Sequence, residues 1–266
     1  MFTTCKKLYQ FFWGGLTYDP GVFLRLLYHF VVPTRPTPVQ EISTEEIVKS
    51  ISEGKSFIRL GDGEMMILTG RDVYFQQTSR DLARGLTAIY KNYNDNSGYM
   101  LGVPTNKLPL PESALTPEER RVWRLYRILF STRFPLNFSY ASATFFYIGG
   151  RFKSLIEPII KNRHVICVSN AQVLDEAFRT YATTTFAHAS FIITPTHNAL
   201  AEQEHILKAI EETLHEHKET TPIILFAAGP ASKAWAYQYA KRGIQCLDIG
   251  HGMQLIAHDG DRSSHI

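Results

Sequence analysis

Residues 57–70 read F-I-R-L-G-D-G-E-M-M-I-L-T-G, and the fold expected for the rest of the chain is built around this stretch. Its first four residues are mostly apolar, which is typical of a short buried strand. Gly61 and Gly63 follow at once, and because glycine readily adopts positive φ, the backbone can turn sharply there. The stretch therefore predicts a strand with two carboxylates, Asp62 and Glu64, at its end.

The spacing of these two carboxylates allows two interpretations. In an extended or turning segment, side chains at i and i+2 point the same way, so Asp62 and Glu64 could bind one hard cation such as Mg²⁺ or Mn²⁺. Arg59 would then stand where it can bond a phosphate in bidentate fashion. Alternatively, the two carboxylates cap a helix over residues 65–68.

The composition is that of an ordinary soluble globular protein. The 266 residues have room for one large domain, and 44% of them are hydrophobic and 20% charged. A net charge of +3 is too small to indicate a nucleic-acid-binding protein. Cys5, Cys167 and Cys246 form no C-x-x-C pair, and two of them fall in expected strands, which favours reduced thiols in a cytoplasmic protein.

Residues 1–38 form an aromatic, basic segment that we expect to be helical and to end in a linker with prolines at 33, 36 and 38. Its apolar run, 22–32, is too short to span a bilayer, which takes roughly 20 residues. Two interpretations remain open. The segment packs on the main domain, or its aromatic and basic side chains make a peripheral contact with the inner face of the membrane.

Residues 39–257 are expected to form one domain, followed by a polar tail over 258–266. S-T-E-E at 43–46 and T-P-E-E at 116–119 are start signals for helices. Strands and helices then alternate, which predicts an α/β fold with a mostly parallel sheet and helices on both faces. The expected strands are 57–60, 99–103, 164–168, 191–194, 223–227 and 244–249, and the helices include 44–52, 79–93, 171–181, 199–217 and 232–242.

Ligands of such sheets bind at the carboxyl ends of the strands. Four strand ends carry polar or glycine residues, at 61–64, 169–171, 228–233 and 248–252. At Gly229 the chain passes directly into a helix, whose N–H groups favour phosphate, with Ser232 and Lys233 as added donors. Asp248 and His251 could supply a metal ligand, a hydrogen bond to a sugar or a base. The alternatives are an ordinary turn between a strand and a helix at Gly229, and a structural histidine that Asp248 holds in place.

Taken together, these stretches resemble the GT-D fold glycosyltransferase family. The segment 57–64, T-G-R at 69–71, F-Q at 75–76, Pro195 with N-A at 198–199, A-G-P at 228–230 and D-I-G-H at 248–251 occur in the family's order. The similarity extends from about residue 42 to about residue 251.

The resemblance implies a Rossmann-like transferase that takes a sugar from a nucleotide-sugar donor, typically a UDP-sugar, with Mn²⁺ or Mg²⁺ held by a D-x-E motif. By position that motif is Asp62 and Glu64, and the expected catalytic residues are these two with Asp248 and His251. The residues expected to bind the donor are Arg59, Gly61, Gly63, Gln76, Asn170, Asn198, Gly229, Pro230, Ser232 and Lys233.

The sequence departs from the family pattern after His251, where G-M-Q-L replaces the expected acidic residues. The general base therefore stays open among His251, Asp248 and the two metal-site carboxylates. The acceptor implied is a glycan, glycolipid or glycoprotein of polysaccharide assembly, with no nucleic acid as partner. Two other functions fit the same motifs: a phosphate-handling hydrolase with the same carboxylate-metal site, and a non-catalytic nucleotide-binding domain.

Overall fold

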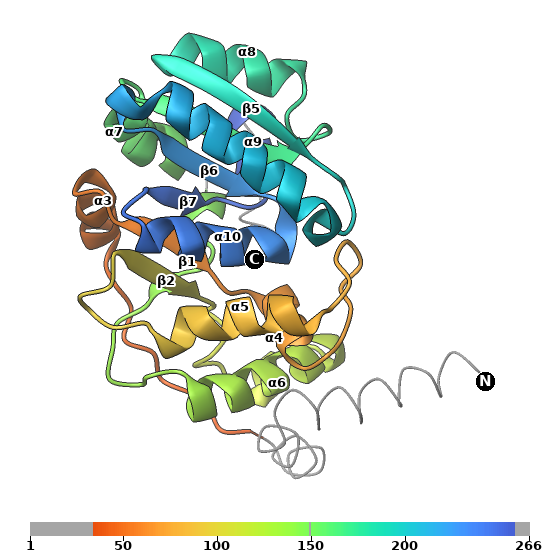
Figure 1. Cartoon of the computed structure of the whole chain (residues 1–266). Coiled ribbons are helices and arrows are strands. Elements are labelled where there is room, and N and C mark those ends of the chain that lie inside the picture. The colour runs from red at the N-terminus through yellow and green to blue at the C-terminus, as the bar shows by residue number, and fades with distance from the viewer. Residues whose placement is uncertain (1–33, 149, 259–266) are drawn as a thin grey trace.

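The computed structural model describes residues 34–148 and 150–258, so the predictions for residues 1–33 and for the tail after 258 lie outside the described residues. Within this part, one sheet has the strand order β3-β2-β1-β7-β6-β4-β5 (Figure 1). Every neighbouring pair in it is parallel. The strands are β1 (Ser56–Arg59), β2 (Tyr99–Val103), β3 (Ala141–Ser142), β4 (His164–Asn170), β5 (His188–Thr194), β6 (Ile223–Ala227) and β7 (Cys246–Asp248).

Helices cover both faces of the sheet, which confirms the predicted fold class. One apolar core joins the sheet to α4 (Asp62–Leu68), α5 (Arg80–Lys91), α6 (Pro117–Arg133), α9 (Gln203–Glu216) and α10 (Gly229–Lys241). The other core joins it to α3 (Thr44–Ser52), α7 (Glu157–Ile160), α8 (Glu176–Thr185) and α11 (Gly252–His258). In Figure 1, α5, α9 and α10 lie on the viewer's side of the strands.

The strand sequences explain why both faces are covered. Ile224 and Phe226 of β6 belong to one core, and Ile223 and Leu225 belong to the other. Successive side chains of a strand point to opposite faces, so a strand that is apolar throughout must be buried on both sides. The continuous apolar runs of the sequence thus require a helical layer on each face of the sheet.

The order of the strands creates a topological switch point at the centre of the sheet. β1 pairs with β2 on one side and with β7 on the other. The helix after β1, α4, packs on one face, whereas the helix after β7, α11, packs on the other. Where successive connections leave toward opposite faces, the carboxyl ends of neighbouring strands open a space for a ligand.

Several helices begin at other residues than the sequence predicted. The long helix predicted from Ala199 begins as α9 at Gln203, and the helix predicted from Ser232 begins as α10 at Gly229. The helix after β1 begins at Asp62 instead of Met65, because Glu64 reaches back to the N–H group of Gly61 and closes the first turn. The helix predicted from 171 begins at Glu176, because the side chain of Asn170 accepts from the N–H groups of residues 172 and 173 and Asp175 caps the helix.

Two other sequence predictions agree with the structure. Ser43 and Thr116 cap α3 and α6 as predicted, each accepting a backbone N–H group with its hydroxyl. Cys167 and Cys246 are buried free thiols of the core. Within the described residues, the length and apolar character of the helices also fall short of a transmembrane span.

Candidate functional site

The strand order brings the predicted motifs together. β1, β7, β6 and β4 are consecutive neighbours, so the segments after them lie along one edge of the sheet. These segments are the four strand ends that the sequence singled out. Topology alone therefore joins residues that are up to about 190 positions apart, as the pair of Arg59 and Asp248 shows at a separation of 189.

A cluster of buried, paired charges lies at this edge of the sheet. The ammonium group of Lys233, on α10, lies 3.2 Å from Oδ1 of Asp248 and 3.8 Å from Oε1 of Glu64. The side chains of these three residues are at most 9% exposed. Oε2 of Glu64 accepts the N–H group of Gly61 at 2.7 Å. Lys233 therefore pairs with two carboxylates that come from opposite ends of the sequence.

Arg59 completes the cluster from β1. Its backbone N–H donates to Oδ2 of Asp248, its Nε donates to the carbonyl oxygen of Asp248 at 3.0 Å, and its Nη1 donates to the carbonyl oxygen of Ala143 at 3.0 Å. Nη1 also bonds the hydroxyl of Tyr147, whose ring lies beneath the guanidinium. Arg59 is 8% exposed. In this structure it anchors Asp248 and the loop of Tyr147, whereas the sequence suggested an open phosphate-binding arginine.

The charges of the cluster balance. Two cations, Arg59 and Lys233, face two anions, Glu64 and Asp248, and buried charges persist in proteins when they are paired in this way. Burial raises the pKa of Glu64, the charge of Lys233 opposes that shift, and the net pKa lies above its usual value. Burial lowers the pKa of Arg59, but Tyr147 and Asp248 raise it by more than that. The net pKa therefore lies above its usual value, and the guanidinium stays charged.

The backbone of Gly250 passes close to this cluster. Gly250 has φ +47°, and a methyl group added to it would lie 2.0 Å from Nη2 of Arg59 and 2.7 Å from the hydroxyl of Tyr147. Both its conformation and its surroundings therefore require glycine.

The two carboxylates of the D-x-E motif point in different directions. Both lie in the first turn of α4, where side chains at i and i+2 diverge, so the expected extended turn is wrong. Asp62 is exposed, whereas Glu64 is buried against Lys233. Across residues 34–148 and 150–258, no group of three or more ligating side chains is arranged to hold a metal ion.

The chemistry of these side chains nevertheless fits a hard cation in one mode. Mg²⁺ is usually bound by one or two carboxylates together with substrate phosphates. Asp62 offers an exposed carboxylate at the mouth of the site, and Glu64 lies two residues away on the same turn. The described residues therefore suit a cation that arrives with a phosphate-bearing substrate, and they do not form a closed protein cage.

The Gly229 turn presents the N-terminus of α10 at the same edge. Gly229 has φ +68°, and the helix that it begins has 13 residues, enough for a full dipole. The hydroxyl of Ser232 is fully buried and donates to the carbonyl oxygen of Gly229 at 2.7 Å. Pro230 is buried and has no N–H group. Ser232 and Lys233 thus hold the turn and the ionic cluster in place, and the groups that can meet an anion are backbone N–H groups.

On the other side of Gly229, the structure joins two residues that the sequence singled out separately. Nε2 of Gln76 donates to Oδ1 of Asn198 at 2.7 Å, and the N–H group of Asn198 donates to the carbonyl oxygen of Phe75 at 2.7 Å. Asn198 has φ +52°, a conformation that asparagine tolerates better than most residues. The loops after α4 and β5 are thereby fastened to each other.

The remaining predicted residues lie at the same edge of the sheet. Asn170 uses its side chain to close the turn after β4. His251 is exposed, and its ring centroid lies 6.2 Å from that of Tyr147. Gly61 precedes α4 as its N-cap, and Gly63 lies in the first turn of that helix.

Sequence reasoning missed Tyr147 and Tyr126. Tyr147 bonds Arg59 across 88 positions, and the hydroxyl of Tyr126 donates to the carbonyl oxygen of Leu60 across 66 positions. Both lie in aromatic stretches that are typical of a core, so no local pattern marks them. Their contacts follow from the fold.

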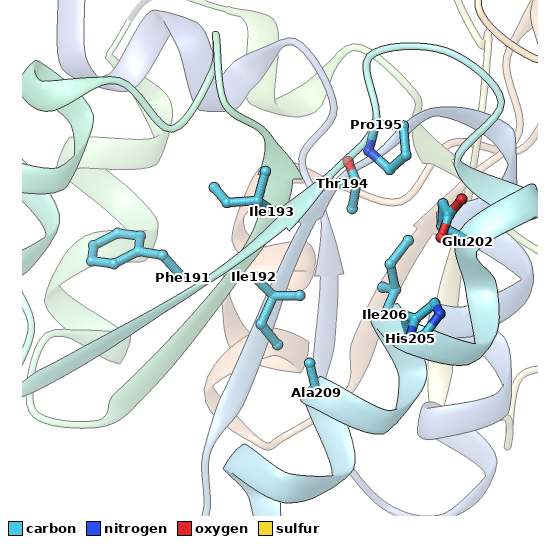
Figure 2. A pocket seen from close by; sticks show the side chains of 9 residues that line it. All are labelled: Phe191, Ile192, Ile193, Thr194, Pro195, Glu202, His205, Ile206 and Ala209. Carbon is cyan, nitrogen blue, oxygen red and sulfur yellow. The ribbon is translucent and has the colours of Figure 1, made fainter.

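A groove of about 530 Å³ lies beside this edge, between β5 and α9 (Figure 2). It is lined mainly by apolar residues of the two elements, together with Thr194, Glu202 and His205. None of the charged residues of the cluster lines it. We place the candidate site at the strand ends because the paired charges, the helix N-terminus and the exposed carboxylate meet there.

Comparison with known proteins bears on the fold. Two solved structures with TM-scores of 0.67 are described as domain of unknown function 1792, one of them as having a distinct glycosyltransferase fold. They are 18% and 19% identical to this chain, and each match covers 83% of this chain and 82% of the other. A third, described as a new glycosyltransferase from Streptococcus sanguinis, has a TM-score of 0.64, 21% identity, and coverage of 80% and 81%. No curated protein sequence matches.

The fold is thus the one described for these glycosyltransferase structures. Residues 140–255 match the family model described as glycosyltransferase GT-D fold. The resemblance drawn from the sequence is confirmed over that range. The matched range contains Gly229, Lys233 and Asp248, whereas Asp62 and Glu64 precede it.

Proposed function

We propose that this chain transfers a sugar from a nucleotide-sugar donor, of the UDP-sugar type, to a hydroxyl of a glycan or lipid-linked acceptor, with a divalent cation. The observation that carries the proposal is the meeting of the N-terminus of α10, at Gly229, with the exposed carboxylate of Asp62 at one edge of the sheet. A helix N-terminus suits a diphosphate. An exposed carboxylate suits a cation that bridges such a diphosphate.

In this proposal the residues of the edge have distinct tasks. Backbone N–H groups at Gly229 bind the diphosphate of the donor. Asp62 would hold Mn²⁺ or Mg²⁺ together with the phosphates of the donor, whereas Glu64 is engaged by Lys233 and Gly61. The cation would neutralise charge on the leaving diphosphate. The ionic cluster of Lys233, Asp248 and Arg59 is a positioning element that fixes the ends of β1 and β7 and the start of α10.

The acceptor hydroxyl needs a base, and burial separates the candidates. Asp248 is 0% exposed, and both of its carboxylate oxygens are engaged, one by Lys233 and one by Arg59. It cannot reach an acceptor that approaches from solvent. His251 is exposed at the same edge and is the base that this geometry favours.

Calorimetric titration of UDP tests the proposal, with Mn²⁺ or with a chelator present. We expect wild-type protein to bind UDP more tightly with Mn²⁺, and Asp62→Asn to lose most of this gain. Asp81→Asn is the matched control, because Asp81 is another exposed carboxylate in the first turn of a helix. Equal binding with metal and with chelator would refute the metal dependence, and no binding of UDP at all would refute the donor class.

A donor screen follows the titration and separates the related functions. Release of inorganic phosphate without any acceptor would indicate the hydrolase. Tight UDP binding with no turnover of any donor would indicate a binding domain. Transfer of radiolabelled sugar to a glycan or lipid acceptor, lost in His251→Ala, would support the proposal.

We also propose a cytoplasmic location, with residues 1–32 in peripheral contact with the membrane. This segment lies outside the described residues, and the argument rests on its aromatic and basic sequence. Flotation of the full chain with anionic vesicles, compared with Lys6→Glu/Lys7→Glu, tests it. Equal flotation of both proteins would contradict the electrostatic contact.

A further inference from the structure

A tight turn after α4 presents two aromatic residues beside the candidate site. Residues 73 and 76 exchange two backbone hydrogen bonds, of 3.0 and 3.1 Å, with Tyr74 and Phe75 between them. The turn is fastened from outside, because Asn198 donates its N–H to Phe75 and accepts the amide of Gln76. Gln76 is only 2% exposed. The turn that carries the aromatic pair is therefore held against the loop after β5 by two hydrogen bonds.

Phe75 fixes the position of this turn relative to the proposed phosphate site. A methyl group added to Gly229 would lie 3.1 Å from the ring of Phe75, so the ring packs directly against the glycine that begins α10. Phe75 is 38% exposed. The turn thus borders the N-terminus of α10.

Tyr74 is the most exposed large side chain of the turn, at 90%. Its ring meets His197 at a centroid distance of 5.3 Å and an interplanar angle of 69°. His197 belongs to the loop after β5 that Asn198 ties to the turn. The tyrosine ring is therefore supported by one neighbouring ring while most of its surface is exposed, and a ligand that stacks on it meets a ring that is already positioned.

We infer that Tyr74, supported by His197, stacks on the nucleobase of the donor. The inference rests on the proposed function and names a residue for recognition of the nucleoside. A diphosphate at Gly229 would place its nucleoside one ribose away, and Tyr74 is the residue next to the one that touches Gly229. Every nucleobase has a flat π-face, and stacking on aromatic side chains contributes strongly to binding of nucleotides.

The test compares UDP with inorganic pyrophosphate as calorimetric probes, each with Mn²⁺. In Tyr74→Ala we expect the dissociation constant for UDP to rise roughly tenfold or more, while that for pyrophosphate stays unchanged. Tyr74→Phe keeps the ring and should stay within about twofold of wild type. Leu136→Ala removes another exposed apolar side chain, which is 56% exposed, and serves as the control.

The outcomes separate this inference from the proposed function. If wild type binds neither probe, both the proposed function and the stacking inference are refuted. If wild type binds both probes and Tyr74→Ala weakens neither, or weakens both equally, the stacking inference alone is overturned. A rise confined to the KM of the acceptor in Tyr74→Ala would assign the ring to the acceptor sugar and would likewise overturn it. Because Tyr74 is 90% exposed, its substitution should leave the urea midpoint unchanged, which checks that the variant is folded.

Discussion

The two sides of the candidate site are built in opposite ways. At the ends of β1 and β7, charged side chains are buried and paired, with Lys233 between Glu64 and Asp248. Beside β5, neutral amides of Gln76 and Asn198 tie two loops together, and aromatic rings face solvent. The first arrangement is rigid because an unpaired buried charge is costly. The second arrangement is weaker, since a neutral hydrogen bond contributes only about 1 kcal/mol to stability.

This difference teaches where stability and recognition are placed. The ionic cluster fixes the backbone from which the Gly229 turn and Asp62 project, and its own side chains are closed to ligands. The side beside β5, which we call the rim, consists of Gln76, Asn198 and the aromatic residues Tyr74 and Phe75, and it leaves these rings exposed to solvent. We therefore expect substitutions in the ionic cluster to act mainly on folding, and substitutions in the rim to act mainly on binding.

The largest expected effect comes from Lys233→Met, which leaves two buried carboxylates with Arg59 as the one remaining cation of the ionic cluster. We expect the free energy of unfolding to fall by about 3–5 kcal/mol, measured by urea denaturation. Lys208→Met is the control, because Lys208 pairs with Glu212 on the surface of α9, where both side chains are more than 60% exposed. The control should lose less than about 0.5 kcal/mol. Equal losses would show that the buried pairing contributes no more than a surface pair.

Gly250→Ala should have the next largest effect, because it combines strain with a clash. The position has φ +47°, and the added methyl group would displace Arg59 or Tyr147. We expect a loss of about 2–3 kcal/mol in urea denaturation.

Gly243→Ala separates strain from clash in that experiment. Gly243 has φ +78° and nothing within 4 Å of the added methyl group, so only strain, about 1 kcal/mol, should be lost. If the two alanine variants are equally stable, Arg59 adapts without cost, and the ionic cluster is less rigid than we describe.

The smallest effect should come from the rim. Asn198→Gly keeps the positive φ and removes the amide that accepts from Gln76, so we expect a loss of about 1 kcal/mol. Hydrogen exchange at the backbone N–H groups of residues 73 and 76 should rise, because the turn loses its fastening. Thr221→Gly is the control, since Thr221 is the other non-glycine residue with positive φ in the described part of the chain. A similar result for both variants would mean that the amide bond does not hold the turn.

The sequence by itself predicted the class of fold and the edge where the site lies. Apolar runs in β4 and β6 fit only strands buried on both faces, and glycine, aspartate and asparagine at strand ends mark the carboxyl edge, since their chemistry is local. It also singled out Gly229, Asp62, Gln76 and Asn198. What it predicted wrongly was local geometry. It expected an extended turn at Asp62, because the hydrogen bond from Gly61 to Glu64 that starts the helix competes with a turn of similar sequence.

Only the tertiary structure decided which side chains pair. The sequence predicted that Lys233 donates hydrogen bonds to a phosphate. In the structure it lies between Glu64 and Asp248, because β7 lies next to β1 and α10 packs over both strands. Arg59 and Tyr147 likewise meet only because β3, which precedes Tyr147 in the chain, joins the sheet two strands away from β1. Such pairings depend on strand order, which arises from packing of the whole chain. The residue types therefore predicted the kind of site. The arrangement of the strands determined which residues stay accessible to a ligand and which pair with one another.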